Sequence, residues 1–170
     1  LVTGDTNNGS DIFIAATGFV GAPVIITSSL PTGTLGTAYS ATLQAIGGTP
    51  PFTWSLRTGS LPSGLSLNPP TGEISGTPTS SGFFTIFARV TDTNSLADDA
   101  DISLTLNNPT PTITALSPSS IVAGSASFNL QVDGTGFLGG GGSVVRWNGT
   151  DRPTTFVSGS RLTAAISSGL

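Results

Sequence analysis

The sequence predicts an all-β protein, with two tandem β-sandwiches preceded by an extended N-terminal strand. Two observations predict this class. Turn-forming residues are abundant, with 23 Gly and 12 Pro in 170 residues, and short runs between the turns alternate apolar with polar residues. Because 36% of the residues are hydrophobic, the chain can bury a sizeable core. We place the three segments at residues 1–22, 23–108 and 109–170.

Residues 1–22 contain a polar turn followed by a strand pattern that belongs to neither sandwich. The strand begins with Ile12, Phe13 and Ile14. The turn and strand together, LVTGDTNNGSDIFIA, resemble the closing part of a blade in WD40-like β-propeller repeats. A calcium loop is the alternative, since the Asp and Asn side chains could supply oxygen ligands. We favour a turn in which these side chains bond their own backbone.

The segment 23–108 has the spacing of an antiparallel sandwich. After a short first strand, four runs alternate apolar with polar residues, at 39–45, 52–56, 84–90 and 102–106. Between the second and third runs lies LPSGLSLNPPTGEISGTP, where Pro-rich and Gly-rich turns leave Leu65, Leu67 and Ile74 facing inward. The alternation gives each strand one buried face. It also places Trp54 in the core rather than on a sugar-binding surface.

Three motifs of this segment carry a family resemblance. GTAYSATLQAIGGTPPFTWSL, LPSGLSLNPPTGEISGTPTSSG and the closing ARVTD resemble the Ig domains of bacterial proteins, which are relatives of cadherin-like sandwiches. The resemblance covers residues 23–108. It implies an Ig-like module that carries no reaction.

Residues 109–170 follow a Pro-rich joint and restart the strand pattern. The order of SPSS (117–120), GTGF (134–137) and SRLTAAI (160–166) resembles an IPT/TIG domain, which also has an Ig-like fold. Such domains end in a hairpin of the type Gly-x-Tyr-x-Val-x-Val, and this sequence stops before it. We therefore expect an IPT/TIG-like sandwich that lacks its last strands. Two explanations stay open: the sequence is a fragment, or an apolar N-terminal strand from a neighbouring copy completes the sandwich.

The composition excludes several classes of chemistry. The sequence has no His, Cys, Met or Lys, so it lacks the residues of a Ser-His-Asp or Cys-His catalytic system, a structural zinc site or a disulfide. A net charge of −4 offers no basic patch for nucleic acid, and no apolar run approaches the roughly 20 residues of a membrane helix. We therefore predict a non-enzymatic protein. Low charge and missing sulfur are typical of an exported bacterial protein, extracellular or at the cell surface.

One acidic cluster is the candidate metal site. Asp92, Asp98, Asp99 and Asp101 are expected in a turn before a strand, where Asp commonly serves capping and solubility, so an acid/base active site is disfavoured. Calcium at Asp92, Asp98 and Asp99 remains a hypothesis, since cadherin-like relatives place ions at domain junctions. No other cofactor is predicted.

Two aromatic residues form the candidate interface of the first sandwich. In the register that buries Phe84 and Ile86, Phe83 and Phe87 lie on the outer face, where the resembling family more often has Thr. Neighbouring exposed aromatics are seldom left in water. We expect this pair to contact another domain or subunit, with a locally covered outer face as the alternative.

These observations predict a structural, adhesive or filament-forming module of a bacterial extracellular or surface protein. Its expected partners are other copies of itself or neighbouring domains of a larger protein, not nucleic acid. The predicted interface residues are Ile12, Phe13, Ile14, Phe83 and Phe87. The alternative functions are an accessory module of a secreted polysaccharide-degrading enzyme, which would bind carbohydrate, and a calcium-dependent adhesin.

Overall fold

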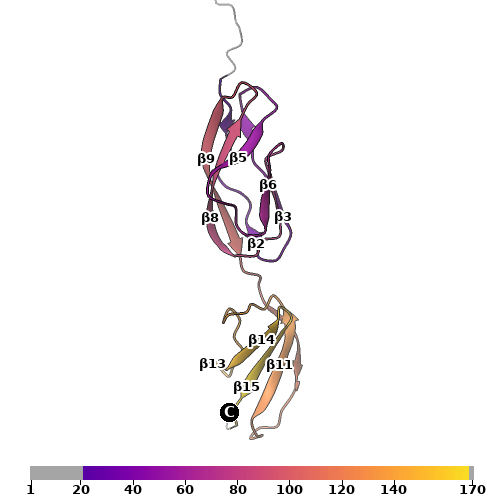
Figure 1. Ribbon diagram of the computed structural model, residues 1–170. Coiled ribbons are helices and arrows are strands. Elements are labelled where there is room, and N and C mark those ends of the chain that lie inside the picture. The colour runs from indigo at the N-terminus through magenta and orange to yellow at the C-terminus, as the bar shows by residue number, and fades with distance from the viewer. Residues whose placement is uncertain (1–20, 169–170) are drawn as a thin grey trace, which may run out of the picture.

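The computed structural model describes residues 21–168, and every regular element among them is a β-strand. The predicted all-β class is confirmed. Two groups of strands follow one another along the chain, coloured indigo to pink and orange to yellow in Figure 1. The segment with Ile12, Phe13 and Ile14, and with it the resemblance to a propeller blade, lies outside the described residues. Within residues 21–168, no helix is long and apolar enough to cross a membrane.

The first group of strands forms a sandwich of two main sheets. Its strands are β1 (Val24–Ile25), β2 (Gly33–Thr34), β3 (Tyr39–Thr42), β4 (Ala45–Ile46), β5 (Thr53–Thr58), β6 (Leu65–Asn68), β7 (Glu73–Gly76), β8 (Gly82–Thr91) and β9 (Ala97–Asn107). One sheet has the order β2-β9-β8-β5 and the other β3-β7-β6, while β1 pairs with β4. The long β8–β9 hairpin is the frame of the larger sheet, because its antiparallel ladder extends along the whole length of β8.

Alternation along these strands buries one face of each sheet, as the sequence predicts. Ile86 and Val90 of β8 are buried, and Phe84 packs against the same cluster. Trp54 of β5, only 4% exposed, and Ile74 of β7, which is 0% exposed, belong to the same buried cluster. The core therefore lies between the two sheets and joins β5, β7, β8 and β9.

The turn-rich stretch 61–78 closes this core by bringing backbone close to backbone. Gly64 has a φ of +90° and no room for a side chain, since a Cβ there would overlap the carbonyl oxygen of Thr77. Gly72 lies against the indole of Trp54, whose Nε1 would be 2.8 Å from an added Cβ. The Trp54 amide also donates a hydrogen bond to the Pro69 carbonyl at 2.8 Å. Glycine at position 72 lets the stretch pack directly on the Trp54 side chain, and glycine at position 64 lets the backbone approach that of Thr77.

The second group of strands forms one sheet and a short hairpin. Its strands are β10 (Thr112–Ser117), β11 (Phe128–Thr135), β12 (Arg146–Trp147), β13 (Thr150–Asp151), β14 (Thr154–Ser158) and β15 (Arg161–Ile166). The sheet has the order β10-β11-β15-β14, and β12 pairs only with β13. Leu130 and Val132 of β11 and Leu162 of β15 are each 3% exposed and form the centre of a second core. One four-stranded layer is thus faced by a two-stranded layer.

The β12–β13 hairpin supplies the aromatic cover of this second core. Asn148 and Gly149 turn the chain with φ of 49° and 77°, both positive as a two-residue type I′ turn requires. Trp147 packs edge-to-face on Phe128, with ring centroids 6.0 Å apart, a favourable geometry for two aromatic rings. This contact places Trp147 against the second core, although its side chain remains half-buried.

Candidate functional site

Three acidic residues lie in strand β9 and not in the turn before it, so the sequence expectation for them was wrong. Because β8 pairs with β9 from the very start of β9, Asp98, Asp99 and Asp101 belong to the ladder. Successive strand residues face opposite sides of a sheet. Asp98 accordingly points to the side of the sheet opposite to that of Asp99 and Asp101. Its Oδ2 accepts a hydrogen bond from the Ile25 amide at 2.8 Å.

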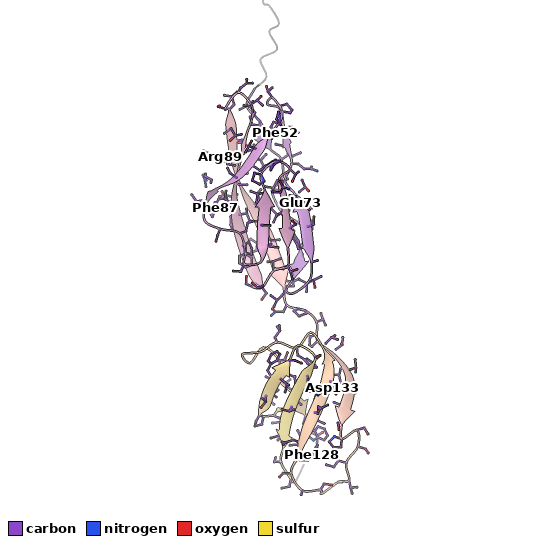
Figure 2. All side chains as sticks on the ribbon, turned by 45° about the vertical axis from the view of Figure 1, so that its right-hand side comes forward. Phe52, Glu73, Phe87, Arg89, Phe128 and Asp133 are labelled. Atoms are coloured by element: carbon purple, nitrogen blue, oxygen red, sulfur yellow. The ribbon has the colours of Figure 1, made fainter. Side chains whose placement is uncertain are left out.

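The other two carboxylates face arginines on the outer side of the same sheet. Asp99 accepts hydrogen bonds of 2.7 and 2.8 Å from Nε and an Nη of Arg89. Those bonds, together with the charge of Arg89, hold the pKa of Asp99 below its usual value. Asp101 lies 3.5 Å from Arg57. In Figure 2, Arg89 and Phe87 lie on one side of the domain and Glu73 on the other.

Asp92 follows β8 and organises the loop that leads to β9. Its Oδ1 accepts hydrogen bonds from the amides of Asn94 and Leu96, both at 2.9 Å, and its Oδ2 accepts one from the Thr49 amide at 3.0 Å. Desolvation raises the pKa of this carboxylate, but the backbone hydrogen bonds together outweigh that effect and leave the pKa lowered. The Asp92 carboxylate therefore has a structural role, because its hydrogen bonds join the loop after β8 to the loop that contains Thr49.

This geometry predicts acid-sensitive stability that depends on Asp92. A lowered folded-state pKa gives stability that is present above about pH 4 and is lost as the pH falls through the folded-state value. Asp92→Asn places an amide group where a carboxylate oxygen accepts a hydrogen bond, so it should lower the urea midpoint more at about pH 7 than at about pH 3. Asp101→Asn is the control, since exposed ion pairs contribute little. Equal losses at both pH values would contradict this role.

The three residues of the calcium hypothesis do not converge. Asp92 caps a loop, Asp98 bonds a backbone amide on the inner side, and Asp99 pairs with Arg89 on the outer side. Within residues 21–168, no three Asp, Glu, His or Cys side chains are grouped so that they could hold a metal ion. The described geometry gives the calcium hypothesis no support.

The outer face of β8 carries the predicted aromatic pair. Phe83 is 72% exposed, whereas Phe87 is partly covered by Arg57, whose guanidinium carbon lies 5.6 Å from the ring centroid. The predicted outward register of both residues is confirmed. Carbohydrate modules commonly stack sugars on a row of free rings, and here only Phe83 is a free ring. Contact of this face with another domain or subunit stays a prediction.

Substituting both phenylalanines with Thr tests this surface. Phe83→Thr/Phe87→Thr should change the free energy of unfolding by no more than about 1 kcal/mol, because Thr suits a strand and neither ring belongs to the core. If the face is an interface, the double variant should also weaken any self-association that small-angle scattering detects in the unmodified chain. Unchanged association would leave the pair as ordinary surface.

A hollow of the second group lies between its two layers. It has a volume of about 530 Å³, with Leu130, Val132 and Leu162 among its lining residues. Ile113 and Leu116 of β10 line one side, and Val145 and Trp147 line another. Arg146 is its one charged lining residue. We call this hollow the β10–β12 groove.

Two strands beside the β10–β12 groove are incompletely covered. All six residues of β10 are exposed, including Ile113 at 64% and Leu116 at 40%. On the other side, β12 pairs with β13 along one edge and has no strand partner on the other among residues 21–168. An apolar groove beside an unpaired strand edge is suited to receive a further strand. Sequence reasoning predicted an open sandwich but did not assign these residues to a groove.

A family model described as "Putative Ig domain" matches residues 22–107. The chain belongs to this family. The predicted resemblance of residues 23–108 to bacterial Ig domains is confirmed, and the matched range is the β1–β9 sandwich of this Ig-domain protein. The β10–β12 groove lies outside the matched residues.

Several solved structures are similar to parts of the Ig-domain chain. A "putative alpha-galactosidase" from Bacteroides fragilis is 26% identical over 53% of this chain and 18% of that chain, with a TM-score of 0.46. The extracellular cadherin domains 1–4 of protocadherin gamma B7 are 20% identical over 88% of this chain and 42% of that chain (TM-score 0.42). An I-band fragment of titin is 15% identical over 88% and 56% (TM-score 0.38). No curated protein matches significantly.

Proposed function

We propose that the chain is a non-enzymatic structural or adhesive module of a bacterial extracellular or cell-surface protein, and that copies assemble into filaments by exchanging a strand. The β10–β12 groove carries this proposal, because a strand that covered it would remove both exposed apolar surface and an open sheet edge. Membership of an Ig domain family supports a structural module. The lack of His, Cys and Lys in the sequence supports the absence of catalysis.

The donor in this proposal is the N-terminal segment of a second copy. Residues 12–16, Ile-Phe-Ile-Ala-Ala, are apolar and uncharged. In strand addition, main-chain hydrogen bonds give affinity and alternate side chains give register. Ile12 and Ile14 would face the groove in one register and Phe13 in the other.

Donor and acceptor lie near opposite ends of the sequence. A contact between two different surfaces of identical copies is heterologous, and it propagates when it does not close into a ring. Each added copy would bring a new donor segment and a new open groove. A head-to-tail filament follows from this arrangement.

Deleting residues 1–20 tests the assembly. The full-length chain should form particles whose mass, measured by multi-angle light scattering, grows with protein concentration, while the deletion variant should stay monomeric because it has no donor. The deletion leaves both described cores intact, so the denaturation midpoint serves as a control for folding. A full-length chain that remains monomeric over the whole concentration range would rule out the filament.

A further inference from the structure

We infer that the acceptor is the free edge of β12, and that residues 11–20 of a second copy add there with alternate side chains in the β10–β12 groove. This inference rests on the proposed function and deepens it by naming the docking site. The alternative acceptor edges are those of β10 and β14, which are the two ends of the four-stranded sheet.

The side-chain pattern around β12 favours this edge. Val145 and Trp147 turn inward and pack against the second core, whereas Arg146 between them is exposed. Asp151 holds Arg146 on the outer side through a 2.8 Å hydrogen bond to Nε. A strand added beside β12 would adopt the same alternation, so every second residue would enter the groove beside Val145 or Trp147 and not beside Arg146, the one charged lining residue.

The floor and rim of the groove define the chemistry of the occupant. The floor is aliphatic, made by the buried Leu130, Val132 and Leu162. The rim adds Ile113, which is 64% exposed, and Val144, which is 49% exposed. Such surfaces gain free energy when apolar side chains cover them. The occupant is therefore an uncharged strand with aliphatic or aromatic residues at alternate positions.

Residues 11–20 of another copy meet this requirement. Their sequence, DIFIAATGFV, has one charged residue, at its first position, and offers either Ile12, Ile14 and Ala16 or Phe13 and Ala15 to the groove. The β14 edge is less suitable, because its exposed Phe156 and Val157 do not line the hollow. Strand addition at β14 would leave the groove uncovered.

Peptide binding to a full-length acceptor tests the site. The acceptor carries Phe13→Asp and Ile14→Asp, which disable its own donor in both registers. The probe is a fluorescein-labelled peptide of residues 11–20, followed by anisotropy. Adding Ile113→Asp should weaken binding by at least about tenfold, because the bound strand would bury a carboxylate against apolar groups. Val157→Asp is the matched control, since Val157 is similarly exposed (54%) on the β14 edge of the same sheet, and it should leave binding unchanged.

A second groove variant, Val144→Asp, should also weaken peptide binding, and it tests the site independently if Ile113→Asp fails to fold. The denaturation midpoint of each variant is measured in parallel. Three results would overturn the inference. These are equal peptide binding by all acceptors, weakened peptide binding by Val157→Asp as well, and no peptide binding to the acceptor with an intact groove. Filaments that form normally despite Ile113→Asp would also overturn it while leaving the proposed function intact. Peptide binding to the groove with full-length chains that stay monomeric would instead refute only the filament.

Discussion

Replacing Trp54 with alanine should lower the free energy of unfolding by about 3–5 kcal/mol, the usual cost of removing a large core aromatic. Trp54 is only 4% exposed and packs in the cluster that contains Ile74 and Val90. The backbone of Gly72 lies against the indole ring and is tied to the Leu43 amide by a 2.9 Å hydrogen bond. Because that backbone is held in place, the cavity left by the indole should collapse only partly.

Urea denaturation of the full-length chain measures this effect. Ser55→Ala is the matched control, since Ser55 is exposed and neighbours Trp54 on the opposite face of β5. The free energy of unfolding of this variant should stay within about 0.5 kcal/mol of that of the unmodified chain. A midpoint that hardly moves in Trp54→Ala would show that the indole does not support the core.

Gly64→Ala should cost about 3 kcal/mol, the sum of a strained backbone and a steric overlap. Gly64 has a φ of +90°, and a Cβ there would overlap the Thr77 carbonyl oxygen. The Thr79 amide donates to the Ser63 carbonyl at 2.8 Å across the same crossing. The two backbone segments therefore cannot separate without loss of a hydrogen bond.

Gly59→Ala separates the two parts of that cost. Gly59 has a φ of +73° but nothing within 4 Å of an added Cβ, so only backbone strain remains, about 1 kcal/mol. Equal denaturation midpoints for Gly64→Ala and Gly59→Ala would show that the close approach of residues 64 and 77 does not constrain the fold.

The strands of the first sandwich were predictable because their hydrophobic pattern has the period of a two-faced sheet. Trp54, Ile86 and Leu104 are buried where alternation places them, and Phe83 is exposed where alternation places it. The glycines and prolines of residues 61–78 marked turns whose positive φ values at Gly64 and Gly72 are observed. In this segment, local residue choice and tertiary packing agree.

The positions of the acidic residues were not predictable from local composition. Asp98 and Asp99 stand next to a turn and have low strand propensity, so a turn was expected. Pairing with β8 places both residues in the ladder. There Asp99 accepts a hydrogen bond from Arg89, and Asp98 accepts one from the Ile25 amide. The Ile25 amide is 73 residues from Asp98 in the sequence, and Arg89 reaches Asp99 only through the β8–β9 pairing, so neither partner gives a local signal.

The β10–β12 groove could be predicted only in outline. The resemblance to an IPT/TIG domain predicted an open sandwich, but the walls of the groove depend on how β10 pairs with β11. Ile113 and Leu116 are spaced three residues apart, and the register of β10 shifts between Ile113 and Ala115. A simple alternation of inward and outward positions therefore does not assign their faces.

Disulfide trapping tests strand exchange into the groove most directly, because the chain contains no cysteine and any disulfide must join two introduced residues. An acceptor copy carries Ile113→Cys, and donor copies of a different tagged mass carry Phe13→Cys or Ile14→Cys. Under mild oxidation, the account predicts a heterodimer on a non-reducing gel with one of the two donors, and little with the control acceptor Val157→Cys. No heterodimer with either donor, or equal trapping by Val157→Cys, would contradict it.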